Sequence, residues 1–503
     1  MRTDWMKLKS GSDIRGDAME HDGIQPTLTS EVAEHVGYAY ALWLAKKTGI
    51  SADKLTIAVG HDSRLTGPEL KGGLIKGLTA ADCDVLDCGL CTTPAMFITT
   101  VEPSTNCDGA IMITASHHPW YKNGFKLITR DGGLEGKDIA EILKSAMEIS
   151  LPQRLVKPFD FLSVYTERLA GMVRELLEDD AKLPLLGLHV VVDAGNGAGG
   201  FYAKFLESLG AYVDGSQFLE PDGRFPNHIP NPEDKNAMAA ISKAVVENEA
   251  DLGVIFDADC DPAAIVDEQG RAINRNRLIA LISAILLEEK AGATIVTDSV
   301  TSSGLARFIT EWGGTHYRFK RGYRNVIDEA IRLNEEGIDC PLAIETSGHA
   351  ALRENFFLDD GMYLVTRLIC EAMNRKREGL TLSSLIDELA EPAESAEIRM
   401  NITDEDFRAA GQTVIETVLN KTLEDAEWHL APDNREGVRI SFNLDGGVDN
   451  AWFLLRLSVH DPVMPLNAES DVPGGVQIMM KQLYELLKDC EGLDLSPLKA
   501  MVE

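Results

Sequence analysis

Short apolar segments alternate along this chain with longer segments whose apolar residues recur at helical spacing. One unit, consisting of an apolar strand, an aspartate, a polar turn, an amphipathic helix and a second strand, occurs three times. Its copies begin at residues 55–62, 188–193 and 293–298. Strands rich in β-branched residues that alternate with helices are typical of βαβ units in mixed or parallel sheets. The pattern therefore predicts three similar α/β domains.

The pattern changes after Glu391. Apolar strands are expected near residues 438–442 and 452–457, followed by a terminal helix from about Val476. This arrangement favours a smaller α+β domain at the C-terminus, and we expect the four domains to surround a central cleft. Boundaries near residues 156, 268 and 390 would divide the chain into segments 1–156, 157–268, 269–390 and 391–503.

Composition and charge make some classes of function, such as nucleic-acid and membrane binding, unfavourable for this chain. The chain has 503 residues, of which 44% are hydrophobic, and a formal net charge of -32. So acidic a surface repels nucleic acid and anionic lipid, and no basic run offsets it. The longest largely apolar stretch, Leu278–Leu287, is about half a membrane span. We expect a cytoplasmic protein that binds neither nucleic acid nor membrane.

A glycine-rich segment in the second repeat, Gly195-Asn-Gly-Ala-Gly-Gly200, fits the dinucleotide-binding pattern, with Asp214 near the expected ribose position. Two residues, Asp193 and Ala194, separate the strand from these glycines, however, and the other repeats have no glycine triplet. The simpler interpretation is a close turn from strand to helix.

The first candidate for chemistry is Ser116, which follows the apolar strand that begins at Gly109 and opens a polar loop. His117, His118 and Lys126 could move protons or balance phosphate charge beside such a serine. The alternative is an ordinary hairpin turning at Asn123-Gly124, a good type I′ sequence. The spacing alone does not decide between them.

The second candidate is Asp257-Ala-Asp259-Cys-Asp261, which follows the apolar segment that begins at Leu252. Three carboxylates in five residues repel one another unless a cation lies among them, and an all-oxygen set suits Mg²⁺. A calcium EF-hand is disfavoured because Pro262 occupies the position that needs glycine. A solvated acidic turn stays open as the alternative.

Two further segments carry polar groups suited to a sugar phosphate. Glu345-Thr-Ser347-Gly-His349 could bind sugar hydroxyls, or its Thr and Ser could cap a helix. Arg456 and Ser458 could hold a phosphate.

Together these motifs and their order resemble the α-D-phosphohexomutase superfamily, which includes phosphomannomutase/phosphoglucomutase and phosphoglucosamine mutase. The resemblance spans nearly the whole chain, begins at Ser10-Gly-Ser-Asp-Ile-Arg15 and is most specific at Thr114-Ala-Ser116-His-His-Pro with Asn123-Gly-x-Lys126. Ser116 matches the phosphoserine, and Arg15 and Lys126 match catalytic-site cations. The implied metal ligands are Ser116, Asp257, Asp259 and Asp261. The implied substrate-binding residues are Glu345, Ser347, His349, Lys320, Tyr323, Arg456 and Ser458.

The resemblance implies that phospho-Ser116 gives its phosphoryl group to a hexose 1- or 6-phosphate, forming a hexose 1,6-bisphosphate. The bisphosphate turns round, returns its other phosphate to Ser116 and leaves as the isomeric monophosphate. Mg²⁺ is the implied cofactor, His117 is a candidate for proton transfer, and the protein is expected to be a monomer or homodimer. The four segments would be, in order, the phosphoserine, metal-binding, sugar-recognition and phosphate-binding domains.

Several residues depart from the family pattern. Pro262 stands where an arginine usually contacts the phosphoserine, and Tyr323 replaces a frequent histidine. Val459 and His460 replace the glycine and threonine of the usual phosphate loop. The alternatives are therefore a sugar-phosphate-binding homologue that has lost turnover, and a phosphoglucosamine mutase.

Overall fold

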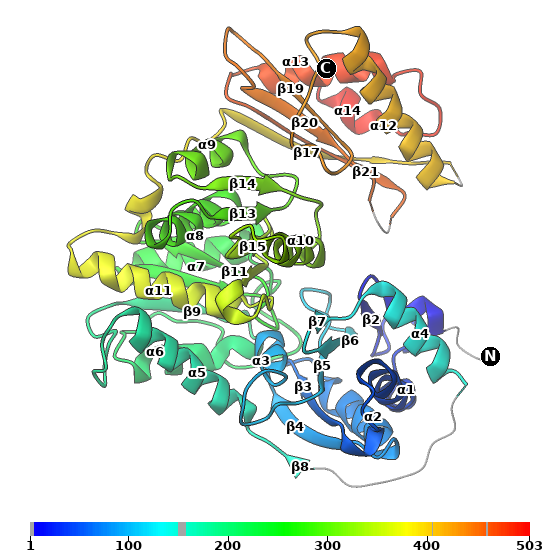
Figure 1. Cartoon of the computed structure of the whole chain (residues 1–503), viewed down its shortest axis with the longest axis vertical. Helices are drawn as coiled ribbons and strands as arrows, with labels where there is room; N and C mark the ends of the chain where they lie inside the picture. The colour runs from blue at the N-terminus through cyan, green and yellow to red at the C-terminus, as the bar shows by residue number, and fades with distance from the viewer. Residues whose placement is uncertain (1–4, 149–156, 405, 459–460, 503) are drawn as a thin grey trace. The chain divides into compact units, whose positions relative to one another are not determined.

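The structure is a computed structural model that describes residues 5–148, 157–404, 406–458 and 461–502 (Figure 1). Its contacts divide the chain into two compact units. The first unit comprises Met1–Asn274 and Ser347–Ser384, and the second comprises Arg275–Thr346 and Leu385–Glu503.

A mixed sheet forms the first part of the first unit. Its strand order is β1-β2-β6-β5-β3-β4-β8, with β7 paired to β6. The strands are β1 (Lys9–Ser10), β2 (Asp13–Asp17), β3 (Thr56–His61), β4 (Asp84–Leu90), β5 (Gly109–Ile113), β6 (Lys122–Thr129), β7 (Gly132–Gly133) and β8 (Lys157–Pro158). β3 runs parallel to β4 and β5, whereas β6 runs antiparallel to β5 and β2. The buried strands β3 and β5 therefore end at the same edge of this sheet.

Four helices accompany this sheet: α1 (Ser30–Thr48), α2 (Gly67–Ala80), α3 (Thr93–Ile98) and α4 (Gly136–Ala146). Helices α1 and α2 pack closely because glycines face the partner's backbone. A methyl group on Gly77 would come 1.8 Å from the carbonyl oxygen of Glu34, and one on Gly37 would come 2.4 Å from that of Leu74. Only glycine permits this separation without displacing a helix.

A second sheet follows in the first unit, with the order β12-β11-β10-β9. Its strands are β9 (Val190–Asp193), β10 (Leu252–Phe256), β11 (Ala263–Asp267) and β12 (Ala272–Ile273). Strand β10 is parallel to β9 and antiparallel to β11, so β10 and β11 are joined by the tight connection that carries the three aspartates. The accompanying helices are α5 (Phe161–Leu176), α6 (Phe201–Ser208), α7 (Lys235–Glu247) and α11 (Gly361–Arg377).

The glycine-rich turn of the second repeat has a packing explanation. A methyl group on Gly197 would lie 2.7 Å from the backbone of Ala258, and one on Gly200 would lie 1.8 Å from the carbonyl oxygen of Leu219. These glycines allow close backbone packing, as the simpler interpretation of the sequence expected.

The second unit contains an α/β part and a C-terminal α+β part. In the first, β13 (Thr294–Thr297) lies parallel to β14 (Thr315–Arg318) and β15 (Leu342–Ile344). Its helices are α8 (Arg275–Glu289), α9 (Ser303–Glu311) and α10 (Tyr323–Glu335). Helix α8 is buried from Leu278 to Leu287. Among the described residues, no helix combines the length and apolar character needed to cross a membrane.

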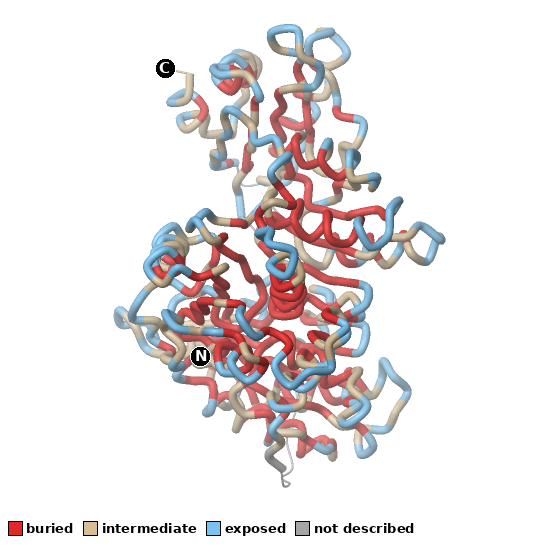
Figure 2. Tube along the Cα trace, turned by 90° about the vertical axis from the view of Figure 1, so that its left-hand side faces the viewer, coloured by how far each residue is buried: buried red, intermediate tan, exposed pale blue. Residues whose placement is uncertain are grey.

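The C-terminal part is an antiparallel sheet with the order β17-β21-β20-β19-β18. Its strands are β17 (Glu394–Asn401), β18 (His429–Leu430), β19 (Val438–Phe442), β20 (Ala451–Leu455) and β21 (Val463–Ser470), and its helices are α12 (Phe407–Glu424), α13 (Gly475–Leu487) and α14 (Ser496–Ala500). Figure 2 shows buried positions along the strands and exposed positions at loops and outer helix faces. The predicted fold class, three α/β domains followed by a smaller α+β domain, is confirmed.

One alternative interpretation and one local expectation were wrong. Asn123 and Gly124 do not form a hairpin turn but lie inside strand β6, where Asn123 is fully buried and donates to the Thr66 hydroxyl. Gly124 is needed because a methyl group there would lie 2.4 Å from the Ile14 carbonyl oxygen of the neighbouring strand. The second strand of the repeat that begins at residues 188–193 was expected at residues 211–214, but this segment forms only an isolated bridge from Tyr212 to His189. The boundary expected at residue 156 lies outside the described residues.

The glycine contacts between α1 and α2 generate a stability prediction. We expect Gly77→Ala to destabilise the protein by about 1–3 kcal/mol, because the added methyl group overlaps backbone. At Gly72, on the same helix, an added methyl group would meet no other atom within 4 Å. Gly72→Ala should instead stabilise by about 0.5–1 kcal/mol through helix propensity. Urea unfolding of both variants measures this, and equal effects would contradict the packing explanation.

Candidate active site

Ser116 lies in the loop between β5 and β6 and is 5% exposed. Its hydroxyl donates to Oδ2 of Asp257 over 2.9 Å, and its Oγ lies 3.3 Å from Nδ1 of His117. The two parts of the first unit therefore bring together a serine and an aspartate 141 positions apart.

Asp257, Asp259 and Asp261 follow β10 and are buried, with exposures of 0%, 0% and 1%. One carboxylate oxygen from each lies within 4.8 Å of the others. Burial, together with repulsion from Asp259 and Asp261, raises the pKa of Asp257 well above its usual value. Burial likewise raises the pKa of Asp261. Three carboxylates in this position are therefore unfavourable unless positive charge is supplied.

Part of that charge comes from Lys126, whose Nζ lies 3.2 Å from Oδ2 of Asp261 and 3.8 Å from Oδ2 of Asp259. Although burial acts in the opposite direction, Lys126 and a hydrogen bond from Thr93 lower the pKa of Asp259. The Thr93 hydroxyl donates to Oδ2 of Asp259 over 2.6 Å.

Among the described residues, nothing hydrogen-bonds to two buried oxygens, Oδ1 of Asp257 and Oδ1 of Asp259. Buried carboxylate oxygens are costly when nothing binds them. Their unpaired state, the all-oxygen donor set and the short separations fit a hard divalent cation such as Mg²⁺. The alternative of a solvated acidic turn is excluded by the burial of all three side chains.

His117 follows Ser116 on the same loop, and Arg15 contacts this loop from strand β2. Nη1 of Arg15 donates to the carbonyl oxygen of Ala115 over 3.2 Å, and its guanidinium pairs with Asp13. Burial, reinforced by the positive charge of Arg15, lowers the pKa of His117 to about 4. The imidazole is therefore neutral near pH 7 in this structure.

His349 lies in the first unit with its Nδ1 2.7 Å from Oδ2 of Asp359. Oδ1 of Asp359 accepts from the backbone N–H of Ala350, so Asp359 fixes the ring from the adjacent turn. One ligand atom from each of His349, Asp359 and Asp261 lies within 4.8 Å of the others, which brings the predicted sugar-binding histidine to the aspartate cluster. Ser347 also lies in this unit, and its buried hydroxyl forms no hydrogen bond with any described residue.

The other predicted substrate-binding residues lie in the second unit. Glu345 follows β15, is 4% exposed and accepts from the backbone N–H of Gly322. Lys320 and Tyr323 lie close to that glycine in sequence, with Tyr323 at the start of α10. Arg456 and Ser458 follow β20.

Burial lowers the pKa of Arg456, and its buried Nε has no hydrogen-bond partner in the part of the chain that the structure describes. Ser458 is held by a backbone hydrogen bond to Val463. Val459 and His460, where departures from the family pattern were noted, lie outside the described residues.

Sequence reasoning missed Thr93 and Asp359 as parts of this site. Thr93 follows a Thr92 that caps helix α3, and Asp359 precedes an Asp360 that caps α11, so both read as ordinary helix starts. For Thr93, the order of the strands could have indicated the site. Thr93 follows β4, which runs parallel to β3, so β3 and β4 end at the same edge of the sheet.

Comparison with known proteins adds independent evidence. Sequence profiles of the phosphoglucomutase/phosphomannomutase α/β/α domains I, II and III match residues 6–152, 164–270 and 274–393. A phosphomannomutase/phosphoglucomutase of Pseudomonas putida is 31% identical over 445 residues, which cover 87% of this chain and 89% of the relative. The chain belongs to the phosphoglucomutase/phosphomannomutase family. It is thereby a member of the α-D-phosphohexomutase superfamily.

Further relatives of this family agree in length and fold. A phosphomannomutase of Salmonella montevideo is 32% identical and matches 95% of this chain and 97% of its own length. The crystal structure of a phosphoglucomutase/phosphomannomutase family protein from Burkholderia thailandensis superposes with a TM-score of 0.78 at 27% identity. It covers 96% of this chain and 97% of that protein.

The buried carboxylates of this family member generate a metal-binding prediction. We expect Mg²⁺ to raise the Tm of the protein by several degrees, because a cation bound only by the folded state stabilises it. Asp257→Asn should raise the Tm measured without Mg²⁺, since it removes one repelling charge, and should lose most of the Mg²⁺ effect. Differential scanning fluorimetry with and without Mg²⁺ measures both.

The exposed Asp84 on β4 provides a control for net charge. Asp84→Asn should respond to Mg²⁺ as the wild-type chain does. An Asp257→Asn protein with an undiminished Mg²⁺ response would show that the cation binds elsewhere.

Proposed function

We propose that this chain interconverts hexose 1-phosphates and hexose 6-phosphates of mannose, glucose or both, by phosphoryl transfer through Ser116. The observation that carries the proposal is the hydrogen bond from the buried Ser116 hydroxyl to Asp257, inside a cluster of three buried aspartates. A serine in that position, once phosphorylated, places its phosphate oxygens beside a cation site. The family names of the relatives support the same reaction class and do not favour phosphoglucosamine mutase.

The residues that would hold Mg²⁺ are Ser116, Asp257, Asp259 and Asp261. When bound, the cation would neutralise charge on the transferring phosphoryl group. Lys126 contributes a further positive charge beside the aspartates, and Arg15 contributes one beside the Ser116 loop. These local charges allow a chain of net charge -32 to bind an anionic substrate.

In the proposed reaction, a sugar hydroxyl attacks the phosphorus of phospho-Ser116, the bond from Ser116 Oγ to phosphorus breaks, and a hexose 1,6-bisphosphate forms. The proton of the attacking hydroxyl ends on Oγ. After the bisphosphate turns round, Oγ of Ser116 attacks the phosphorus of the other phosphate group, the bond from that phosphorus to the sugar oxygen breaks, and this oxygen takes up the proton as the isomeric monophosphate leaves. His117 lies within reach of Oγ and stays a candidate for proton transfer.

The residues proposed for substrate recognition fall into two groups. Those proposed for the sugar hydroxyls are Glu345, Ser347 and His349. Those proposed for the distal phosphate and its surroundings are Lys320, Tyr323, Arg456 and Ser458. The unpaired Ser347 hydroxyl and Arg456 Nε are available for such contacts.

The roles proposed for segments 1–156, 157–268, 269–390 and 391–503 are, in order, phosphoserine chemistry, metal binding, sugar recognition and phosphate binding. We propose that the protein works in the cytoplasm as a monomer or homodimer.

A second candidate function follows from Pro262, which has no group able to donate to a phosphate. The arginine usual at this position would supply a guanidinium to the phosphoserine. If Lys126 and Arg15 do not compensate for its loss, the chain would bind sugar phosphates without turning them over.

Activity of the purified protein tests the proposal. With Mg²⁺ and a trace of glucose 1,6-bisphosphate, we expect glucose 1-phosphate or mannose 1-phosphate to be converted to the 6-phosphate, and intact mass to show one phosphate on the protein. Ser116→Ala should lower kcat by at least about 10³-fold and abolish that phosphate, because the covalent intermediate cannot form.

Ser242→Ala, on helix α7, is the matched control and should retain wild-type kcat and phosphorylation. Sugar-phosphate binding by calorimetry with no turnover and no phosphate on Ser116 would favour the binding homologue. Turnover that survives in Ser116→Ala would contradict the role of Ser116.

A further inference from the structure

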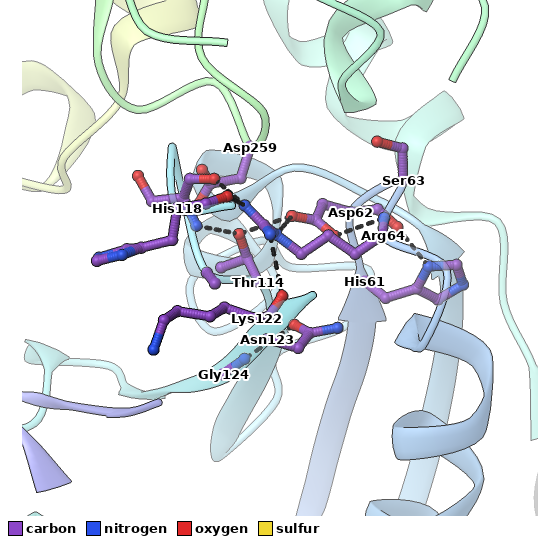
Figure 3. A network of polar contacts seen from close by, with 12 residues as sticks. His61, Asp62, Ser63, Arg64, Thr114, His118, Lys122, Asn123, Gly124 and Asp259 are labelled. Carbon is purple, nitrogen blue, oxygen red and sulfur yellow. Dashed lines mark hydrogen bonds and ion pairs between the residues drawn. The ribbon is translucent and has the colours of Figure 1, made fainter. Parts of the chain in front are cut away.

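Arg64 lies in the turn after β3, and its side chain is completely buried. Its guanidinium donates to main-chain carbonyl groups of the loop between β5 and β6 and of Lys122, the first residue of β6 (Figure 3). Nη1 donates to the carbonyl oxygens of Pro119 and Lys122, each over 2.9 Å. Nη2 donates to those of Ser116 and, over 2.8 Å, His118. One side chain therefore contacts the loop along most of its length.

Asp62 extends this arrangement to the start of the loop. Its Oδ2 lies 3.2 Å from Nε of Arg64 and accepts a hydrogen bond of 2.8 Å from the Thr114 hydroxyl. The Thr114 oxygen in turn accepts from the backbone N–H of Ser116 over 2.9 Å. Arg64 and Asp62 together thus fix the main chain on both sides of Ser116.

Ser116 needs such support because its φ is 53°, in the left-handed region that serine rarely adopts. A free loop would relax toward a more common conformation and would carry the Oγ away from Asp257. The planar, five-donor guanidinium suits the task, because it can bind several carbonyl groups at fixed angles.

The following part of the first unit covers Arg64. The ring of Phe225 lies 5.2 Å from the guanidinium carbon, a cation–π contact. Gly223 approaches so closely that a methyl group on it would lie 2.6 Å from the Ser63 carbonyl oxygen and 2.7 Å from Cα of Arg64. The Ser63 hydroxyl donates to the carbonyl oxygen of Asn196 over 2.9 Å.

We propose that Arg64 is a positioning residue for phosphoryl transfer, which holds the Ser116 loop in the conformation that presents Oγ to the aspartates. Segment 222–225 keeps Arg64 in place, so the part of the chain that carries the aspartates also sets the conformation of the serine loop. The inference rests on the proposed function for its kinetic consequence. Its structural consequence, an ordered loop, is independent of turnover.

Arg64→Met keeps the length of the side chain and removes its donors. We expect kcat to fall about 100-fold, as for a misplaced reacting group, while KM for glucose 1-phosphate changes by less than about threefold. Hydrogen exchange followed by mass spectrometry should show faster exchange in residues 115–122, with helix α2 still protected. Wild-type kcat, or faster exchange spread evenly over residues 5–148, would overturn the proposal.

Gly223→Ala tests the same idea without touching Arg64, and it serves if Arg64→Met does not fold. The added methyl group should push segment 222–225 off Arg64, lower kcat and speed exchange in residues 115–122. Gly171→Ala on α5, where a methyl group meets nothing within 4 Å, should leave both unchanged. A Gly223→Ala protein with unchanged kcat and unchanged exchange would contradict the proposal.

Different results would contradict the proposed mutase function and the proposed role of Arg64. Absence of turnover in the wild-type chain contradicts the proposed mutase function, and the exchange of residues 115–122 still tests Arg64. Wild-type turnover with normal kcat in both variants contradicts the role of Arg64 alone.

Discussion

The carboxyl groups of Asp257, Asp259 and Asp261 are buried within one turn, and their mutual repulsion is the constraint to which the rest of the site responds. At short separations and low dielectric, such charges are unfavourable unless cations or hydrogen-bond donors face them. Lys126 and Thr93 supply part of that compensation, and two oxygens stay unpaired. The arrangement therefore fits a cation bound among the three carboxylates.

The topology explains how this turn meets Ser116. β10 and β11 are antiparallel neighbours, so their short connection projects the aspartates from the end of the second sheet. β5 lies beside β3 in the first sheet, and the loop after β5 therefore lies beside the turn after β3, which contains Asp62 and Arg64. Buried strands thus fix the position of the aspartates and of the serine loop, and the buried polar contacts set the finer geometry.

Much of this could be predicted from the sequence. The repeated strand-helix pattern indicated the domain types because burial on both faces of a sheet leaves a strong apolar signal. Three acidic residues after an apolar strand indicated the carboxylate cluster, and the cation itself stays a prediction. The Asn123-Gly124 pair left a hairpin turn open as an alternative, but a dipeptide preference for turns is weaker than the need for a glycine between neighbouring strands. Arg64 and Thr93 contact residues that are far away in sequence, and Asp359 contacts His349 across a turn. A local sequence pattern does not predict such contacts.

The most direct test of this cation site is a crystal structure of the phosphorylated protein grown with Mn²⁺, with anomalous scattering used to locate the metal. We expect one strong anomalous peak bound by Asp257, Asp259 and Asp261, with an oxygen of the phosphate on Ser116 as a further ligand. A metal bound away from these aspartates, or aspartates that hydrogen-bond to one another with no metal between them, would contradict the site.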